Sequence, residues 1–456
     1  MSRTLLATLL FVLGCTTPIR TPRVSASASA PAPDIDDPAA RAAHIAPALD
    51  GYSATYVLLW KGARIGEAHE RFAAHPQDAN RYHFQRLEHI VVKRGGTRVA
   101  TETVVEVDTD AMLTPTQVIV SYQTEGVRTQ AEAVRLPDRS WLVTHPGRPQ
   151  RIVSGAAIPS TLMPLLVVGR TRTPGRVFEG PVLIEGAGLA LVQVSVELHD
   201  DHRSLSAAIY SPTAELHARA LLDQRGRIVE AGDPQGVTSR LASRDELAES
   251  FDPPEIVQAS AIMVDGEPVG DDRLHLLVKN VRKAPPNIAE IPDQAIIAQK
   301  DVPNGSWEVR VDPPAIPTSG FAFEEVRERT SFVARSLEDD LRAPGLTLVP
   351  EVLLSMGRGD CTAHALVLAK LLENKGYEAK LVTGLLLEGN VLLRHRWVTV
   401  RIGEHWVAVD PTLDEVPASP TRLALAVHGA SPDEVAFIDD ATFAGWERAV
   451  VQYWRE

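Results

Sequence analysis

Residues 357–376 read GRGDCTAHALVLAKLLENKG, and this stretch decides the organisation of the C-terminal part of the chain. The sequence Gly-Arg-Gly-Asp before Cys361 is typical of a loop, because glycine and aspartate favour turns. The residues that follow predict a helix over 362–375, which ends at Gly376 in the C′ position. Its inward face contains Ala365, Leu366, Ala369 and Leu372. Cys361 is therefore expected at the start of a helix.

A cysteine at a helix start is predisposed to lose its proton. The unpaired N–H groups and the helix dipole favour an anion there, so a thiolate forms at a lower pH than in a free cysteine, whose pKa is ~8.5. Cys361 is one of two cysteines in the chain. The alternative is a buried structural thiol, which is a common fate of cysteine.

Proton partners for this thiol are expected in residues 395–412, which read HRWVTVRIGEHWVAVDPT. The pattern predicts two strands joined by a two-residue turn at 403–404. Such a turn places Ile402 opposite His405. The register of the whole hairpin follows from this one pair.

Counting outward from the turn places Asp410 opposite Trp397, and His395 then lies on the same face of the hairpin as Asp410. Diagonal neighbours of this kind have Cα atoms ~7–8 Å apart, which allows a hydrogen bond between an imidazole and a carboxylate. Asp410 would then orient His395 so that its other nitrogen faces Cys361. The spacing thus permits a catalytic triad.

Three motifs in this order resemble the transglutaminase-like superfamily, whose fold resembles that of papain-type cysteine proteases. They are Gly-Asp-Cys at a helix start, His-x-Trp in a following strand, and Trp-x-x-x-Asp-Pro-Thr in the next, within residues 320–415. The resemblance implies Cys361 as nucleophile, His395 as general base and acid, and Asp410 as the orienting carboxylate. It implies a protein or peptide substrate attacked at an amide bond, by hydrolysis or by acyl transfer to an amine, and no metal or organic cofactor.

Two residues depart from the common pattern of that superfamily. Arg396 precedes the tryptophan where a small residue is frequent, and His364 stands where many members have an acidic or other polar residue. Cys361 and His364 also have the spacing of half a metal site, although structural zinc sites more often use several thiolates. A further alternative is a non-catalytic binding or scaffold protein whose C-terminal domain is inactive.

The N-terminus predicts export and a lipid anchor. Arg3 is followed by an apolar run from Leu5 to Leu13, which is too short to span a bilayer as a helix and is typical of a secretory signal. Val-Leu-Gly-Cys ending at Cys15 resembles the lipobox of bacterial lipoproteins, in which the cysteine is lipidated. We therefore expect a signal peptide over 1–15 and an outer-membrane lipoprotein that faces the periplasm or the cell surface.

Residues 16–47 are rich in Pro, Ser and Ala and are expected to form a disordered tether. Residues 48–245 alternate with a period of two and predict a β-rich, mostly antiparallel domain, in sandwich or partly closed form. In Arg98–Asp108, one face carries Val99, Thr101, Thr103, Val105 and Val107, and further along Val192, Val194, Val196 and Leu198 repeat the pattern.

Residues 246–315 predict a small β module or linker, and residues 316–456 a transglutaminase-like domain, so that the fold class is α+β. The last domain should open with a helix that carries Phe323, Val326, Thr330, Val333, Leu337 and Leu341 on one face and ends near Pro344-Gly345. We expect the pair Asp339-Asp340 to be solvated.

The charge of the chain argues against one class of partner. It has 46 basic and 59 acidic residues, a net charge of −13, and no long basic run. Phosphate backbones are bound by clustered Lys and Arg, so no nucleic-acid partner is expected. The sequence leaves the oligomeric state open.

Overall fold

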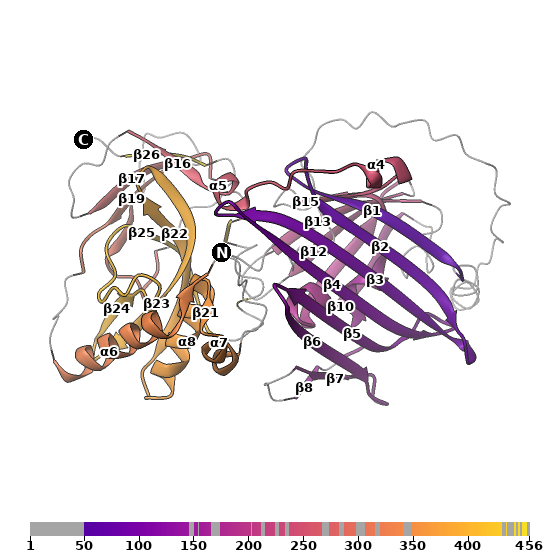
Figure 1. Ribbon diagram of the computed structural model, residues 1–456, viewed down its shortest axis with the longest axis horizontal. Coiled ribbons are helices and arrows are strands. Elements are labelled where there is room, and N and C mark those ends of the chain that lie inside the picture. The colour runs from indigo at the N-terminus through magenta and orange to yellow at the C-terminus, as the bar shows by residue number, and fades with distance from the viewer. Residues whose placement is uncertain are drawn as a thin grey trace.

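The computed structural model describes residues 50–453 with internal gaps (Figure 1). The gaps are 146–149, 154, 166–173, 202, 211–214, 224–227, 233–236, 267–272, 282–286, 298–305, 315–319, 341–348, 431–434, 436–441, 444–445 and 447–448. The predicted signal peptide, Cys15 and the predicted tether over 16–47 lie outside the described residues, as do Leu341 and Pro344-Gly345.

The N-terminal part of the described chain is one sheet of fifteen strands, in the order β8-β7-β6-β5-β4-β3-β2-β1-β15-β14-β13-β12-β11-β10-β9. The strands are β1 Tyr52–Trp60, β2 Ala63–His75, β3 Asp78–Arg94, β4 Thr97–Asp110, β5 Pro115–Thr124, β6 Val127–Arg135, β7 Trp141–Thr144, β8 Arg151–Val153, β9 Ile158–Pro159, β10 Gly175–Ile184, β11 Ala190–Leu198, β12 Ser204–Tyr210, β13 Glu215–Leu222, β14 Ile228–Gly232 and β15 Val237–Leu241. Two short 3-10 helices, η1 Ser160–Leu162 and η2 Glu185–Ala187, flank β10.

The predicted alternation along two of these strands is confirmed. In β4 the side chains from Val99 to Val107 at every second position are buried, and the valines and the final leucine of β11 are buried in the same way. All strand pairs in this sheet are antiparallel except that of β9 with β10. The expectation of a β-rich, mostly antiparallel N-terminal region is therefore confirmed.

The sheet curls over, so that the strands from β1 to β6 form a layer in front of the strands from β10 to β13 (Figure 1). One hydrophobic cluster fills the space between them, with Tyr56, Phe72, Phe84, Trp141 and Ile184 among its most buried members. The same interior holds a buried ion cluster, in which Arg86 binds Glu70 and Glu88. Tyrosine hydroxyls donate to the remaining oxygen of Glu70, so its charge is compensated on both sides.

A second sheet has nine strands. Eight of them lie side by side in the order β18-β19-β17-β26-β16-β23-β22-β25, and β24 pairs with β23. The strands are β16 Ile262–Asp265, β17 Leu274–Lys279, β18 Gln294–Ile297, β19 Trp307–Val311, β22 Ala379–Glu388, β23 Val391–Ile402, β24 His405–Val409, β25 Arg422–His428 and β26 Val450–Tyr453. The segment 246–315, expected as a small β module or linker, thus contributes four strands to the sheet of the C-terminal domain.

Five helices are described outside the first sheet: α4 Arg244–Ala248, α5 Ile256–Ala259, α6 Phe321–Ser336, α7 Pro350–Met356 and α8 Cys361–Glu373. Helix α8 packs against β22 and β23 on one side and against α6 and α7 on the other. Its ends agree with the sequence prediction, because Asp360 is the N-cap and Gly376 follows the C-terminal turn with a positive φ of 87°.

The predicted end of the first helix of this domain was wrong. Phe323, Val326, Thr330 and Val333 form its buried face as expected, but α6 ends at Ser336, ahead of Pro344-Gly345. The next residues are extended, because β20 (Glu338–Asp339) pairs in parallel with β21 (Arg358–Gly359). The helical period of the sequence does not reveal that these residues pair with a strand from another part of the chain.

The predicted solvation of Asp339-Asp340 was wrong for Asp340. Asp339 is exposed, whereas Asp340 is buried and its carboxylate lies 3.2 Å from the guanidinium of Arg358. Its backbone N–H also donates to the carbonyl of Gly359 over 3.0 Å. The second aspartate is therefore part of the support for the loop before Cys361.

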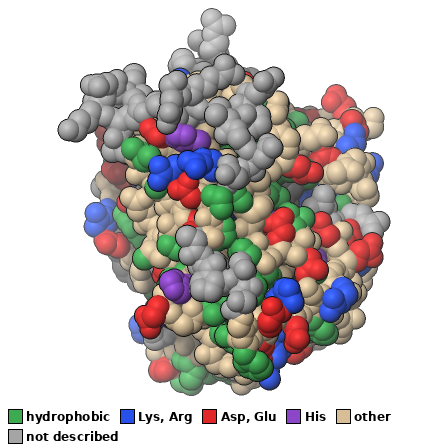
Figure 2. All heavy atoms as spheres, turned by 90° about the vertical axis from the view of Figure 1, so that its left-hand side faces the viewer, with side chains coloured by type: hydrophobic (Ala, Val, Ile, Leu, Met, Phe, Trp, Pro, Cys, Tyr) green, Lys and Arg blue, Asp and Glu red, His purple; other side chains and the backbone are tan. Residues whose placement is uncertain are grey.

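The surface of the C-terminal domain carries charges of both signs. Figure 2 shows acidic and basic side chains interspersed over this face, with small apolar areas between them. No described helix has both the length and the apolar character needed to cross a membrane.

Candidate active site

The loop before α8 places Cys361 at the first position of the helix. The carboxylate of Asp360 accepts hydrogen bonds from the backbone N–H groups of Thr362 at 3.0 Å and Ala363 at 3.1 Å. These bonds satisfy donors that a helix start leaves unpaired, and they fix the turn from which the helix grows. Cys361 is 8% exposed and is not part of a disulfide.

Gly359 is required by the close approach of this turn to the helix. A Cβ atom at this position would lie 2.3 Å from the Cβ of Ala363. The backbone cannot move aside easily, because Gly359 pairs with Asp339 in the short parallel sheet. Packing thus explains the glycine of the Gly-Asp-Cys motif, whereas the sequence analysis had assigned this glycine only to turn formation.

The hairpin that carries the other two predicted residues has the predicted register. Ile402 pairs with His405 across the turn, and the ladder continues to Val398 opposite Val409. Asp410 follows directly, and its backbone leaves the ladder to form a bridge with Glu415. The prediction of a two-residue turn is therefore confirmed.

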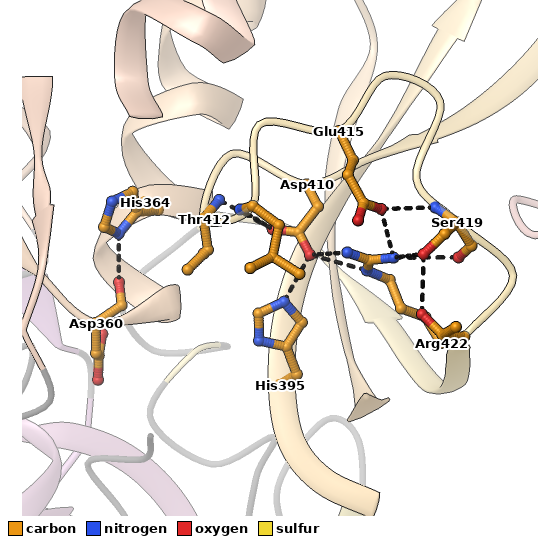
Figure 3. A network of polar contacts seen from close by, with 10 residues as sticks. Asp360, His364, His395, Asp410, Thr412, Glu415, Ser419 and Arg422 are labelled. Atoms are coloured by element: carbon orange, nitrogen blue, oxygen red, sulfur yellow. Dashed lines mark hydrogen bonds and ion pairs between the residues drawn. The ribbon is translucent and has the colours of Figure 1, made fainter. Parts of the chain in front are cut away.

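The structure brings His395 and Asp410 together, as this register predicted. The Nε2 atom of His395 lies 2.7 Å from Oδ2 of Asp410 (Figure 3). Asp410 is completely buried and His395 is nearly so, so their charges attract each other with little screening by water. Because Nε2 faces the carboxylate, Nδ1 is the ring nitrogen left for another partner.

That partner is Cys361, whose thiol forms a hydrogen bond with the side chain of His395. Burial lowers the pKa of His395, but the charge and hydrogen bond of Asp410 raise it to about 9. For Cys361, burial raises the pKa of the thiol, whereas the hydrogen bond and charge of His395 lower it. Both shifts favour a thiolate-imidazolium pair.

Arg422 supports Asp410 from the opposite side, and the sequence analysis missed it. Its Nη2 and Nε atoms lie 2.6 and 2.8 Å from Oδ2 of Asp410, and the side chain is 3% exposed. Glu415 and Ser419 hold the other end of the guanidinium (Figure 3). Arg422 lies in β25, and no local motif in the sequence marks it as a partner of Asp410.

Asp410 is held by its own turn as well. Its Oδ1 atom accepts a hydrogen bond from the backbone N–H of Thr412 at 2.9 Å. Burial raises the pKa of Asp410, but His395 and Arg422 lower it well below its usual range. Asp410 therefore stays ionised and can stabilise a charged imidazole.

Trp397 covers the ion pair. Its ring is stacked on that of His395, with centroids 6.1 Å apart and an interplanar angle of 19°, and it is buried. On β22, Gly384 lies opposite His395, and a Cβ at this position would lie 2.7 Å from the Trp397 ring. This glycine makes room for the backbone oxygen of Leu423, which would lie 2.1 Å from such a Cβ, and for the tryptophan, whose ring covers the imidazole.

The two residues that depart from the superfamily pattern both have structural contacts. Arg396 is buried and donates to the hydroxyls of Thr383 at 3.0 Å and Thr362 at 3.3 Å. His364 contacts the carbonyl oxygens of Asp360 at 3.0 Å and Leu337 at 3.1 Å, one through each ring nitrogen. These contacts direct both nitrogens of His364 toward backbone acceptors.

The same contacts bear on the metal alternative. A ligand histidine needs a ring nitrogen directed at the ion, whereas His364 turns both toward carbonyl oxygens. Within the described part of the chain, no group of three or more His, Cys, Asp or Glu side chains is arranged to hold a metal ion. The half-site spacing of Cys361 and His364 is therefore not completed there.

A family model, described as the transglutaminase-like superfamily, matches residues 320–411. The chain contains a transglutaminase-like domain. The match includes Cys361, His395 and Asp410, and it ends before Arg422. It covers helices α6 to α8 and strands β22 to β24, so the large N-terminal sheet lies outside it.

Two solved structures show distant similarity. A β-barrel-like protein of a domain of unknown function from Brucella abortus is 10% identical, with a TM-score of 0.32 over 42% of this chain and 95% of its own. A candidate cysteine protease from Cytophaga hutchinsonii is 14% identical, with a TM-score of 0.25 over 42% of this chain and 82% of its own. No curated protein matches the chain.

Proposed function

We propose that the protein is a thiol enzyme that acts on amide bonds of a protein or peptide substrate. Cys361 is the nucleophile, His395 the general base and acid, and Asp410 the orienting carboxylate. The observation that carries this proposal is the continuous chain of contacts from the thiol through the imidazole to the buried carboxylate. The transglutaminase-like domain match supports it.

The proposed reaction begins with the thiolate-imidazolium pair. The sulfur of Cys361 attacks the amide carbonyl carbon and forms a C–S bond, while the carbonyl π electrons move to the oxygen. As the oxyanion collapses, the C–N bond breaks and His395 transfers its proton to the leaving amine. The product of this half-reaction is a thioester on Cys361 and a free amine.

In the second half-reaction, neutral His395 removes a proton from water or from an acceptor amine. The oxygen or nitrogen then attacks the thioester, and the C–S bond breaks to return the thiolate. Water gives a carboxylic acid, and an amine gives a new amide. We favour hydrolysis, because transfer to an amine requires a second binding site in addition.

Asp410 stabilises the imidazolium in both half-reactions because it remains ionised. We assign stabilisation of the oxyanion to the backbone N–H of Cys361 at the start of α8. Asp360 already accepts hydrogen bonds from the next two N–H groups, which belong to Thr362 and Ala363.

A peptide library with and without a fluorescent primary amine tests the reaction type. The wild type should release new carboxyl termini, detected by mass spectrometry, and Cys361→Ala should release none above background. Incorporation of the amine, abolished by the same substitution, would show acyl transfer instead of hydrolysis. If wild type and Cys361→Ala gave identical products, the enzyme proposal would be refuted in favour of a binding or scaffold protein.

We also propose that the chain is exported and anchored to the outer membrane through lipidated Cys15. The apolar run and the lipobox-like sequence support this proposal. Cys15→Ser should move the full-length protein from the membrane fraction to the soluble fraction of a bacterial host and abolish labelling by a radioactive fatty acid. Cys361→Ser is the control and should leave the membrane fraction unchanged. Continued lipid labelling of Cys15→Ser would contradict the anchor.

A further inference from the structure

A hydrogen bond joins the residues that directly follow the proposed nucleophile and the proposed base. Thr362 follows Cys361 at the start of α8, and Arg396 follows His395 on β23. Nη1 of Arg396 donates to Oγ1 of Thr362 at 3.3 Å. This contact therefore ties the element that carries the thiol to the element that carries the imidazole.

Arg396 lies on the face of β23 that packs against α8. Side chains alternate along a strand, so Val398 and Val400 share this face, and both belong to the hydrophobic cluster that contains Leu366 and Leu372 of α8. Arg396 itself is 3% exposed. Burying a charge is costly, and the hydrogen bonds of a guanidinium offset this cost and are directional. An apolar residue such as these valines would pack here without linking two particular elements.

A second hydrogen bond fixes Arg396 to β22. Its Nε donates to Oγ1 of Thr383 at 3.0 Å, and Thr383 is the residue paired with Arg396 across the two strands. The guanidinium is planar and rigid, so a bond at Nε also determines where Nη1 lies. Thr383 thus directs the other arm of the same side chain toward Thr362.

Thr383 is held in turn by His428 of β25. Nε2 of His428 lies 3.1 Å from Oγ1 of Thr383, and Nδ1 lies 2.8 Å from the carbonyl oxygen of Gly429. A carbonyl oxygen only accepts, so Nδ1–H donates to Gly429, and Nε2 of the neutral ring accepts from the hydroxyl of Thr383. The side chains of Thr362, Arg396, Thr383 and His428 are all buried. A continuous set of buried hydrogen bonds therefore runs from β25 through β22 and β23 to the start of α8.

We propose that Arg396 is a positioning residue that holds the first turn of α8, and with it the thiol of Cys361, at hydrogen-bonding distance from His395. This inference rests on the proposed function and deepens it, because it assigns a role in that site to a residue at which the chain departs from the superfamily pattern.

The first turn of α8 needs a contact with the sheet in addition to its cap. Asp360 accepts a hydrogen bond from the backbone N–H of Thr362, and this bond determines the shape of the turn. Asp360 belongs to the same loop, so the cap does not determine where the turn lies relative to β23. The bond from Arg396 to the side chain of Thr362 supplies this second constraint. A displacement of about 1 Å between reacting groups can lower a rate about 10²-fold, so the constraint matters for turnover.

The test measures activation of the thiol and needs no substrate. The rate at which iodoacetamide alkylates Cys361 in the full-length protein is followed against pH by mass spectrometry of the peptide that contains it. Arg396→Met should raise the midpoint of this profile by about one pH unit, because the thiol loses part of the hydrogen bond and charge of the imidazole. Thr362→Val should shift the midpoint in the same direction, although it leaves the guanidinium charge in place. Thr362→Ser keeps a hydroxyl and should retain the wild-type midpoint.

The matched control is Arg394→Met. Arg394 precedes His395 on β23, and its guanidinium lies 4.5 Å from the centroid of the Phe443 ring, so its loss should leave the midpoint unchanged. Equal shifts in Arg394→Met and Arg396→Met would overturn the inference. A wild-type midpoint in folded Arg396→Met, or in Thr362→Val, would also overturn it, because a merely structural arginine changes the melting temperature alone. If Arg396→Met did not fold by circular dichroism, the two Thr362 variants would decide the question.

His395→Ala separates this inference from the proposed function. It should raise the midpoint at least as much as Arg396→Met does, and adding Arg396→Met to it should cause no further shift, because Arg396 acts through the imidazole contact. A further shift in the double variant would refute the positioning role. A shift in His395→Ala without one in the Arg396 and Thr362 variants would leave the enzyme proposal intact and refute the role of Arg396. No shift in His395→Ala would refute the enzyme proposal and, with it, the inference that rests on it.

Discussion

Replacing His395 with alanine is expected to lower turnover of an amide substrate by about 10³- to 10⁴-fold. His395 contributes to three steps: it lowers the pKa of Cys361, protonates the leaving amine and deprotonates the second nucleophile. Loss of the imidazole removes all three. The measurement is kcat/KM on the substrate found in the peptide screen.

The pH dependence of alkylation provides an independent readout of the same change. Because the pKa of His395 is raised to about 9 and its imidazole lowers that of Cys361, the wild type should hold a thiolate-imidazolium pair at neutral pH. Iodoacetamide should therefore react well below pH ~8.5, the pKa of a free thiol. In His395→Ala the imidazole no longer opposes the effect of burial on the thiol pKa, so the reaction should require a higher pH than in the wild type.

His405 offers a matched control, because it lies on the same hairpin and is exposed. His405→Ala should keep the wild-type rate and pH profile. Equal alkylation profiles for wild type and His395→Ala would show that the imidazole does not activate the thiol, and the proposed mechanism would then fail.

Replacing Arg422 with methionine is expected to lower the free energy of unfolding by about 3 kcal/mol, because it removes one of the two cationic groups, Arg422 and His395, that compensate a buried carboxylate. Asp410 has no exposed surface, so water cannot take the place of the guanidinium. Glu415 loses its partner in the same change. Chemical denaturation of the C-terminal domain, followed by tryptophan fluorescence, measures the loss.

Arg401→Met is the matched control, because Arg401 is an exposed member of the same sheet and pairs with Glu378 and Glu404 on the surface. It should change stability by less than about 0.5 kcal/mol. If Arg422→Met were as mild as Arg401→Met, Arg422 would not be the support of the carboxylate that the contacts indicate.

The effect of Arg422→Met should depend on pH in a defined direction. The pKa of Asp410 is lowered in the folded protein, so the stability it contributes is present above its unfolded pKa of ~3.9 and is lost as the pH falls through the folded value. The difference between wild type and Arg422→Met should therefore be largest near neutral pH and shrink in acid. A difference that grew on acidification would contradict this assignment.

Local sequence signals were sufficient to predict the elements that carry the three proposed catalytic residues. The helix start at Cys361 could be predicted because Asp360 caps the helix within three residues of sequence. The relation of His395 to Asp410 could be predicted because a two-residue turn determines the register of the whole hairpin. Both depend on hydrogen bonds between residues close in sequence.

Contacts between distant segments escaped the same reasoning. The sequence of the segment that contains strands β16 to β19 predicted a small separate module or linker. In the structure these strands complete the sheet of the transglutaminase-like domain through pairings with β23 and β26. The end of α6 depends in the same way on a strand that begins at Arg358. A strand can pair with any suitable edge of a sheet, so the local sequence pattern of a strand does not identify its partner strand.

By itself, the sequence determined that a thiol stands at a capped helix start and that a histidine and an aspartate share one face of a hairpin. Only the tertiary structure decided that Arg422 supports the carboxylate. The physical reason is the range of the forces. Caps and turns act over a few residues, whereas buried charges are matched by whichever cation the folded chain brings near them.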